Sequence, residues 1–131
     1  MKRLVILSVL VAVAIASSSR SYSDDKLIKA IHQVEASGRV GKISGDGGKA
    51  LGPLQIHYAN WKDAVEYDKT IGGKYSDCQN LEYSKKIFKA YTERYASGKS
   101  AEVKARIWNG GPNALKKDST KAYWNKVQAK L

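Results

Sequence analysis

With 131 residues the chain has room for one domain, and its content of 43% hydrophobic and 27% charged residues is that of a globular protein rather than a disordered one. The formal net charge of +11 favours a polyanionic partner, although a basic surface also serves simply to keep a protein in solution. The lysines are spread along the chain and no nucleic-acid-binding motif is recognisable, so we expect no nucleic acid among its partners.

The chain opens with a basic pair, an apolar run and small residues at Ala14-Ile15-Ala16, the pattern of a secretory signal peptide. We predict this signal over residues 1–16, because the apolar run is shorter than the roughly 20 residues that span a bilayer. Residues 17–23 are serine-rich and are expected to form a flexible leader to one domain over 24–131. The mature protein should then be secreted, with a formal charge of +9 once the basic pair is removed. We expect it to bind anionic bacterial walls without stable membrane insertion, and to be a monomer.

Cys78 is the only cysteine, so no disulfide can form within the chain. We expect a buried free thiol, with pairing to a second molecule as the alternative. No cysteine or histidine stands at metal-ligand spacing near it, and no glycine-rich segment has the order of a phosphate-binding loop. The sequence therefore predicts neither a metal nor another cofactor.

A first helix is predicted from Asp24, with Ser23 or Asp24 as its cap and apolar residues at helical spacing as far as Val34. Ser37-Gly38 supplies its end, which places Glu35 in the last turn. Five glycines interrupt residues 39–56, a pattern that favours a small β-hairpin or irregular sheet.

A second helix is predicted over about 58–68, followed by a loop at Gly72-Gly73. The longest helix should span 80–96, where one face carries an apolar stripe that we assign to the core. The stripe consists of Leu81, Ser84, Ile87, Phe88, Tyr91 and Tyr95.

Ser100 can cap a short helix that runs through Ile107, and the residues 109–112 form a tight turn. A terminal helix should start at Ser119 or Thr120. Its buried side would carry Tyr123, Trp124 and Val127. The predicted fold class is therefore α+β, mainly helical, with a small sheet lobe beside the helices.

Two carboxylates, Glu35 and Asp46, stand on either side of the glycine-rich segment. A glutamate at a helix end in an apolar neighbourhood has a raised pKa and can act as a general acid. An aspartate among glycines is approached by backbone amides, which favour its ionised form, although the same residues could simply build a hairpin turn. Two carboxyl groups in unequal environments are the usual means of cutting a glycosidic bond. Asp63 is a weaker candidate for the second carboxylate.

Gly52-Pro53 should fix a bend that directs Gln55 and His57 to one side and Leu54 and Ile56 to the other. Gln55 can then face a cleft and hydrogen-bond the acetamido group of a sugar, or make a structural hydrogen bond.

With these segments placed, the chain resembles the invertebrate-type lysozymes, the family that includes destabilase. The most specific segments are Ala105-Arg-Ile-Trp-Asn-Gly-Gly-Pro-Asn113 and Ser119-Thr-Lys-Ala-Tyr-Trp-Asn-Lys-Val127. Similar family segments are Gly52-Pro-Leu-Gln-Ile56, Ala90-Tyr-Thr-Glu-Arg-Tyr95 and Val34-Glu35-Ala-Ser-Gly38.

The resemblance implies a lysozyme-like fold and a muramidase that hydrolyses the β-1,4 bond between N-acetylmuramic acid and N-acetylglucosamine. It implies that Glu35 is the general acid, while Asp46 matches the family's aspartate only across a gap. Family members are rich in cysteine, so this chain resembles a cysteine-poor branch. The residues expected to line the sugar cleft are Gln55, Tyr58, Trp61, Trp108, Asn109, Gly110 and Gly111.

Two alternatives remain open from the sequence. A lytic transglycosylase could work with Glu35 alone and would leave a 1,6-anhydro sugar. A cationic protein with the same fold could bind walls or membranes without catalysis, as the charge of +9 suggests.

Overall fold

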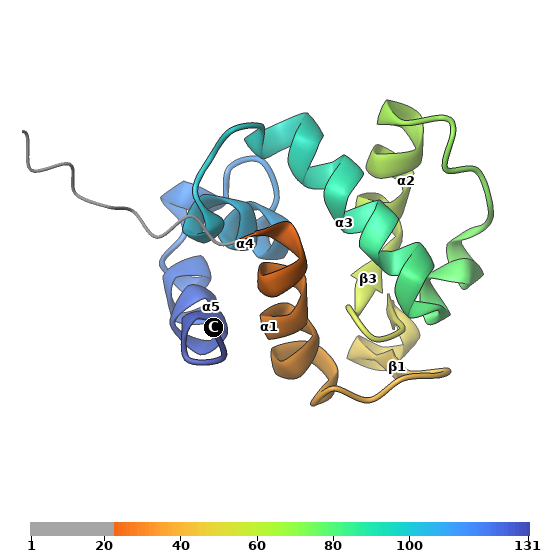
Figure 1. Ribbon diagram of the computed structural model, residues 1–131, viewed down its shortest axis with the longest axis horizontal. Coiled ribbons are helices and arrows are strands. Elements are labelled where there is room, and N and C mark those ends of the chain that lie inside the picture. The colour runs from red at the N-terminus through yellow and green to blue at the C-terminus, as the bar shows by residue number, and fades with distance from the viewer. Residues whose placement is uncertain (1–22) are drawn as a thin grey trace, which may run out of the picture.

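The computed structural model describes residues 23–131 (Figure 1). The predicted signal peptide and all but the last residue of the predicted leader lie outside the described residues. Within 23–131, five α-helices surround the core and a small three-stranded sheet lies at one side, which confirms the predicted α+β, mainly helical architecture. No helix in this part of the chain is long and apolar enough to cross a membrane.

The first helix, α1 (Asp24–Ala36), begins and ends where the sequence predicts. The Ser23 hydroxyl accepts a hydrogen bond from the Lys26 amide, and Ser37 ends the helix in a left-handed conformation with φ of 53°. Leu27, Ile28 and Ile31 are fully buried on one face.

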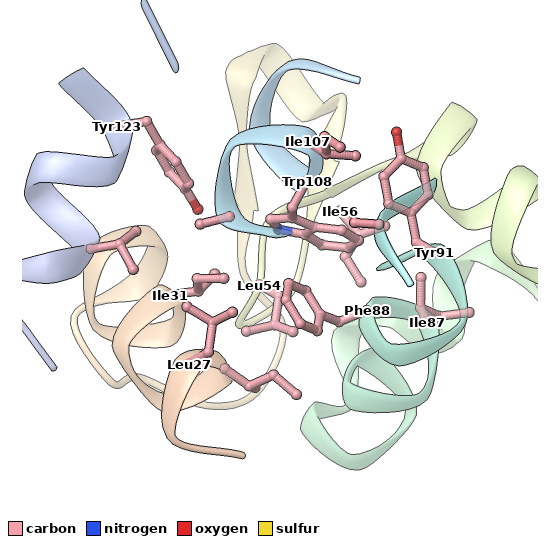
Figure 2. Packing of buried hydrophobic residues seen from close by; sticks show 14 of the residues in the cluster. Leu27, Ile31, Leu54, Ile56, Ile87, Phe88, Tyr91, Ile107, Trp108 and Tyr123 are labelled. Carbon is pink, nitrogen blue, oxygen red and sulfur yellow. The ribbon is translucent and has the colours of Figure 1, made fainter. Parts of the chain in front are cut away.

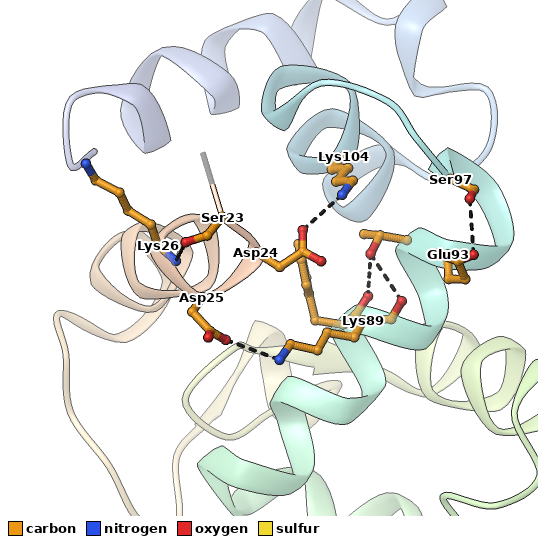
Figure 3. Close-up of polar contacts among 10 residues, drawn as sticks. Ser23, Asp24, Asp25, Lys26, Lys89, Glu93, Ser97 and Lys104 are labelled. Carbon is orange, nitrogen blue, oxygen red and sulfur yellow. Dashed lines mark hydrogen bonds and ion pairs between the residues drawn. The ribbon is translucent and has the colours of Figure 1, made fainter. Parts of the chain in front are cut away.

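Two ion pairs fasten the start of α1 to later helices (Figure 3). The Lys104 ammonium on α4 (Ala101–Gly110) lies 2.9 Å from the Asp24 carboxylate. The Lys89 ammonium on α3 (Leu81–Ala96) lies 3.2 Å from the Asp25 carboxylate. Both pairs are at least partly exposed, so they add little to the buried apolar face of α1, which holds the helix against the core.

The glycine-rich segment forms an antiparallel sheet in the order β1-β2-β3. The strands are short: β1 (Ser44–Gly45), β2 (Ala50–Leu51) and β3 (Ile56–His57). A 3₁₀ turn, η1 (Asp46–Gly48), joins the first two strands. The predicted small hairpin or irregular sheet is thus confirmed, with a third strand added.

The bend at Gly52-Pro53 is a turn rather than the beginning of an extended segment, yet it sorts the side chains as the sequence predicts. Leu54 and Ile56 are fully buried, whereas Gln55 is half-buried and His57 exposed. Only glycine fits at position 52: its φ is 77°, and a Cβ there would lie 1.8 Å from the carbonyl oxygen of Cys78. Close backbone packing at this glycine therefore holds the sheet against the helices.

Helix α2 (Tyr58–Tyr67) follows the sheet, and α3 then supplies the centre of the core. The predicted stripe on α3 packs inward, with Ile87, Phe88 and Tyr91 buried and Leu81 and Tyr95 partly buried. Figure 2 shows Phe88 and Tyr91 beside Trp108 of α4. The ring centroids of these two residues lie 5.0 and 5.5 Å from that of Trp108 in edge-to-face arrangements, which stabilise a core by about 0.5–1.5 kcal/mol per pair beyond area burial.

The end of α4 differs from the prediction, because the helix runs past Ile107 to Gly110 and the turn begins at Gly111, whose φ is 84°. Gly110 is the last residue of the helix and lies against α5, because a Cβ there would lie 2.5 Å from Thr120 Cγ2. The prediction mistook a glycine that permits close packing for one that ends a helix.

The last helix, α5 (Asp118–Gln128), begins one residue before the predicted start, and Thr120 is not its cap. Thr120 is fully buried; its hydroxyl accepts a hydrogen bond from Arg106 Nε at 3.0 Å and donates toward the carbonyl oxygen of Ala114 at 2.7 Å. The apolar side of α5 carries Tyr123, Trp124 and Val127, as predicted.

Candidate active site

A cleft of about 470 Å³ opens where the end of α1, the sheet lobe and the end of α4 meet. It brings together both predicted carboxylates and most of the predicted sugar-binding residues. Its lining consists of Glu35, Asp46, Ala50, Gln55, His57, Asn60, Trp108, Asn109, Gly110 and Gly111.

Glu35 reaches the cleft from the last turn of α1 and is half-buried. Burial raises the pKa of its carboxyl group above the ordinary glutamate value, while the hydroxyl of Tyr123 and the positive charge of Lys126 partly offset this rise. The negative end of the α1 dipole also disfavours an ionised side chain here. Glu35 is therefore suited to hold a proton and deliver it within the cleft.

Asp46 reaches the cleft from the 3₁₀ turn between β1 and β2, with a backbone φ of 51°. Its carboxylate is 67% exposed and lies 3.5 Å from Nε2 of His57 on β3. The Asp46 carboxylate is therefore open to water, with the imidazole of His57 beside it. The predicted pair thus lies in one cleft in unequal environments, with Glu35 enclosed and Asp46 solvated.

Gln55 lines the same cleft as the two carboxylates. Its backbone φ is 50°. Its amide nitrogen donates a hydrogen bond to the carbonyl oxygen of Gly52 at 2.9 Å, so it makes the structural bond as well as facing the cleft. Gly45 leaves the space that this side chain occupies, because a Cβ at position 45 would lie 2.0 Å from Gln55 Oε1. The side chain is therefore held in place from two sides.

The end of α4 forms the opposite part of the lining. Trp108 is only 5% exposed and belongs to the core as much as to the cleft, whereas Asn109 is exposed. The Lys117 ammonium donates a hydrogen bond to the carbonyl oxygen of Gly110 at 2.9 Å. This contact holds the backbone after Trp108 at the rim of the cleft.

Tyr58 and Trp61 of α2 are not among the residues that line the cleft. Trp61 packs against the core and its indole N–H donates to the Tyr83 hydroxyl at 2.9 Å. Tyr58 is 54% exposed, and its ring centroid lies 5.4 Å from that of Trp61.

Asp63 also lies away from the cleft lining. Its carboxylate accepts a hydrogen bond from the Tyr95 hydroxyl at 2.9 Å, and Arg94 lies 3.9 Å from it. Its partners show a structural position, which leaves Asp46 as the second carboxylate of the cleft.

Sequence reasoning missed Asn60, whose side-chain amide donates to the carbonyl oxygen of Trp108 at 3.2 Å and joins α2 to the cleft. It also assigned no role at the site to His57, Tyr123 or Lys126. A local signal existed for His57, which shares a side with Gln55. Tyr123 and Lys126 reach Glu35 from another helix, and only the fold reveals that contact.

Comparison with known proteins supports one family. No protein-family model matches the chain. Lysozyme 1 of Crassostrea virginica is 36% identical over 85 residues, which cover 61% of this chain and 44% of the oyster protein. The lysozyme of Meretrix lusoria is 32% identical over 87 residues, which cover 63% of this chain and 68% of the clam protein. The match therefore spans less than half of the oyster relative and about two thirds of the clam relative.

Solved structures agree with these relatives. The crystal structure of Tapes japonica lysozyme superposes with a TM-score of 0.67 at 26% identity, over 82% of this chain and 92% of the other. Meretrix lusoria lysozyme in complex with Aeromonas hydrophila PliI gives a TM-score of 0.67 at 30% identity, over 79% and 87% of the two chains. The predicted resemblance is confirmed: the chain belongs to the invertebrate-type lysozyme family, as a member with a single cysteine.

Proposed function

We propose that this protein is a secreted muramidase, a glycoside hydrolase that cleaves the β-1,4 bond between N-acetylmuramic acid and N-acetylglucosamine in bacterial peptidoglycan. The observation that carries the proposal is the pairing in one cleft of an enclosed Glu35, with a raised pKa, and a solvated Asp46. The basic chain suits a negatively charged wall, to which its field would attract it. Such an enzyme serves in defence against bacteria or in their digestion.

In the proposed reaction, protonated Glu35 gives its proton to the glycosidic oxygen as the bond from that oxygen to the sugar carbon breaks. Asp46 stabilises the positive charge that develops on the sugar ring, or bonds to its carbon. Water then supplies a hydroxyl group to the carbon and returns a proton to Glu35. The products are two shorter glycan chains, one with a new reducing end, and both carboxyl groups regain their starting state.

The proposed sugar contacts follow the lining of the cleft. Gln55 and Asn109 offer side-chain amides to acetamido groups, and the backbone at Gly110 and Gly111 lets a sugar approach closely. The side chain of Trp108 provides an apolar floor. Tyr58 and Trp61 would contact a longer glycan beyond the cleft, where the exposed ring of Tyr58 can stack on a sugar face.

The decisive experiment compares wild-type protein with Glu35→Gln on a suspension of bacterial walls. The expected loss in clearing rate is at least about 100-fold, because the amide cannot donate an acidic proton. Equal clearing by both proteins would show a cationic protein that acts without catalysis. The chemistry is read from the products: new reducing ends support hydrolysis, whereas 1,6-anhydro ends would identify a transglycosylase.

A further inference from the structure

A buried tyrosine hydroxyl without a formed hydrogen bond lies beside Glu35. Tyr123 is 8% exposed, and its hydroxyl oxygen is the buried side-chain polar atom within residues 23–131 that has no hydrogen-bond partner in that range. Figure 2 shows its ring reaching from α5 toward the space between α1 and α4, with the hydroxyl end inward. An unpaired buried hydroxyl is unfavourable, and a phenylalanine ring would fill the same space without that cost. The hydroxyl thus does little for the core around it.

Helices α1 and α5 pack together, and the Tyr123 hydroxyl and the Glu35 carboxyl influence each other's pKa, although the structure forms no hydrogen bond to the hydroxyl. Tyr123 lowers the pKa of Glu35, against the larger effect of burial. Burial and the nearby Glu35 charge together raise the pKa of Tyr123 well above its ordinary value. Tyr123 therefore keeps its proton throughout the range in which Glu35 titrates, and it is a donor to the Glu35 carboxylate.

The other polar groups near the cleft differ from the Tyr123 hydroxyl, because they are charged or already have partners. Lys126, one turn after Tyr123 on α5, acts on Glu35 through its charge. Asp46 and His57 line the same cleft from the sheet lobe and pair with each other. His32, on α1 itself, is bonded to the carbonyl oxygen of Arg39 at 2.6 Å. The part of α4 that lines the cleft, Trp108 to Gly110, carries no charge. Tyr123 is thus a neutral donor among charged or already bonded groups.

Building on the proposed muramidase function, we propose that Tyr123 is a positioning residue whose hydroxyl hydrogen-bonds the Glu35 carboxylate formed during the reaction. When Glu35 gives its proton to the leaving sugar oxygen, an enclosed negative charge appears at its carboxyl group. The Tyr123 O–H then donates a hydrogen bond to that charge without giving up its own proton. When water returns a proton to Glu35, the stronger charge-assisted bond is lost. Tyr123 thereby stabilises the charged state and holds the carboxylate toward the water.

The variant Tyr123→Phe tests this role, and the chain supplies a matched control. The Tyr95 hydroxyl donates a hydrogen bond to the carboxylate of Asp63 at 2.9 Å, away from the cleft. We expect Tyr123→Phe to lower kcat about 10-fold with little change in KM, since a hydrogen bond to a charged group is lost in the reaction and not in substrate binding. Tyr95→Phe should keep the wild-type kcat and KM.

The pH profile separates positioning from a purely structural role. Removing the donor should raise the pKa of Glu35, so the high-pH limb of kcat/KM should move to higher pH in Tyr123→Phe and stay in place in Tyr95→Phe. A fall in kcat with an unmoved limb would overturn the proposal.

A second measurement does not depend on activity. The side-chain carboxyl of Glu35, followed by ¹³C NMR in the folded protein, should titrate at higher pH in Tyr123→Phe than in wild type. An unchanged midpoint would overturn the proposed pairing even in an active enzyme. If the Glu35 midpoint shifts in Tyr123→Phe but wild-type protein does not cleave walls, the pairing is supported and the muramidase function is rejected.

Folding of the variant is checked by thermal unfolding at acidic pH, where Glu35 is protonated and Tyr123→Phe should match or exceed wild type because the unpaired hydroxyl is gone. If the variant does not fold, wild-type protein still provides the test. The ring resonance of Tyr123 Cζ should follow the titration of Glu35 and lose that step in Glu35→Gln. A Tyr123 Cζ resonance that does not change as Glu35 titrates would overturn the proposal.

Discussion

His57 Nε2 and the Asp46 carboxylate lie 3.5 Å apart at the rim of the cleft, one on β3 and the other on the turn that links β1 to β2. Neither residue is adjacent to the other in the sheet register, in which His57 pairs with Ala50. Gly45, which precedes Asp46, pairs with Ala50, and Ala50 pairs with His57, so the register brings the start of η1 toward the imidazole. The short sheet thus serves to place a solvated carboxylate opposite the enclosed carboxyl group of Glu35.

Replacing Asp46 by asparagine should lower kcat on the order of 100-fold, the usual effect of removing one group that stabilises transition-state charge. The amide keeps the shape of the side chain but carries no negative charge, so folding should be preserved. Steady-state hydrolysis of wall fragments measures the loss. Asp63→Asn is the control, because Asp63 faces Tyr95 away from the cleft and should retain near-wild-type activity. Loss of activity in the control with retention in Asp46→Asn would reverse the assignment.

The raised pKa of Glu35 predicts how the stability of the folded protein depends on pH. A group whose pKa is higher in the folded than in the unfolded protein stabilises the fold below its unfolded pKa, near 4.3 for glutamate, and loses that contribution as pH rises through its folded pKa. Glu35→Gln should therefore be more stable than wild type at neutral pH, with the difference shrinking as the solution is acidified toward pH 4. Thermal unfolding across this range measures it. A constant difference at every pH would contradict the enclosed carboxyl group.

How far the sequence predicts this fold depends on whether a signal is local. The extent of α1 and the position of Glu35 follow from a cap, a periodic apolar face and a stop, all within neighbouring residues. The side on which Gln55 lies follows from the bend at Gly52. The coupling of Glu35 to Tyr123 depends on how α1 packs against α5, which no local pattern contains.

The aromatic residues illustrate the same limit. A tryptophan in a sequence fits a sugar platform as well as a core, and burial decides between them. Trp108 lines the cleft from within the core, whereas Trp61 packs between α2 and α3, where its indole N–H donates to the Tyr83 hydroxyl. The sequence could not place Trp61 relative to the cleft, because the orientation of α2 against α3 is a tertiary property; its role in sugar binding stays a prediction.

Gly110→Ala tests the close contact of α4 with α5. Alanine would gain about 1 kcal/mol of helix propensity. Its Cβ would, however, lie 2.5 Å from Thr120 Cγ2 and 3.0 Å from Ala114 Cβ, and the buried Thr120 is fixed by hydrogen bonds to Arg106 and Ala114. Overpacking of this kind costs about 1–3 kcal/mol, so the net effect should be a loss of about 1 kcal/mol.

Urea unfolding would measure that loss. Asn109→Ala, at the neighbouring residue in the last turn of α4, is the control. Asn109 is exposed, and its replacement should change the free energy of unfolding by less than about 0.5 kcal/mol. A Gly110→Ala variant more stable than wild type would mean that α5 moves away without penalty and that helix propensity decides at this position.

The thiol of the single cysteine should not react with thiol reagents in the folded protein. Cys78 is fully buried, and burial, with a smaller contribution from Asp77, raises the pKa of its thiol to about 12. At pH 8 roughly one molecule in ten thousand would then carry the reactive thiolate, far fewer than for an ordinary exposed thiol. Labelling with a thiol reagent should therefore be negligible in native protein and complete in urea. Rapid native labelling, or a disulfide-linked dimer on non-reducing gels, would instead show that this part of the core opens readily enough for Cys78 to pair with a second molecule.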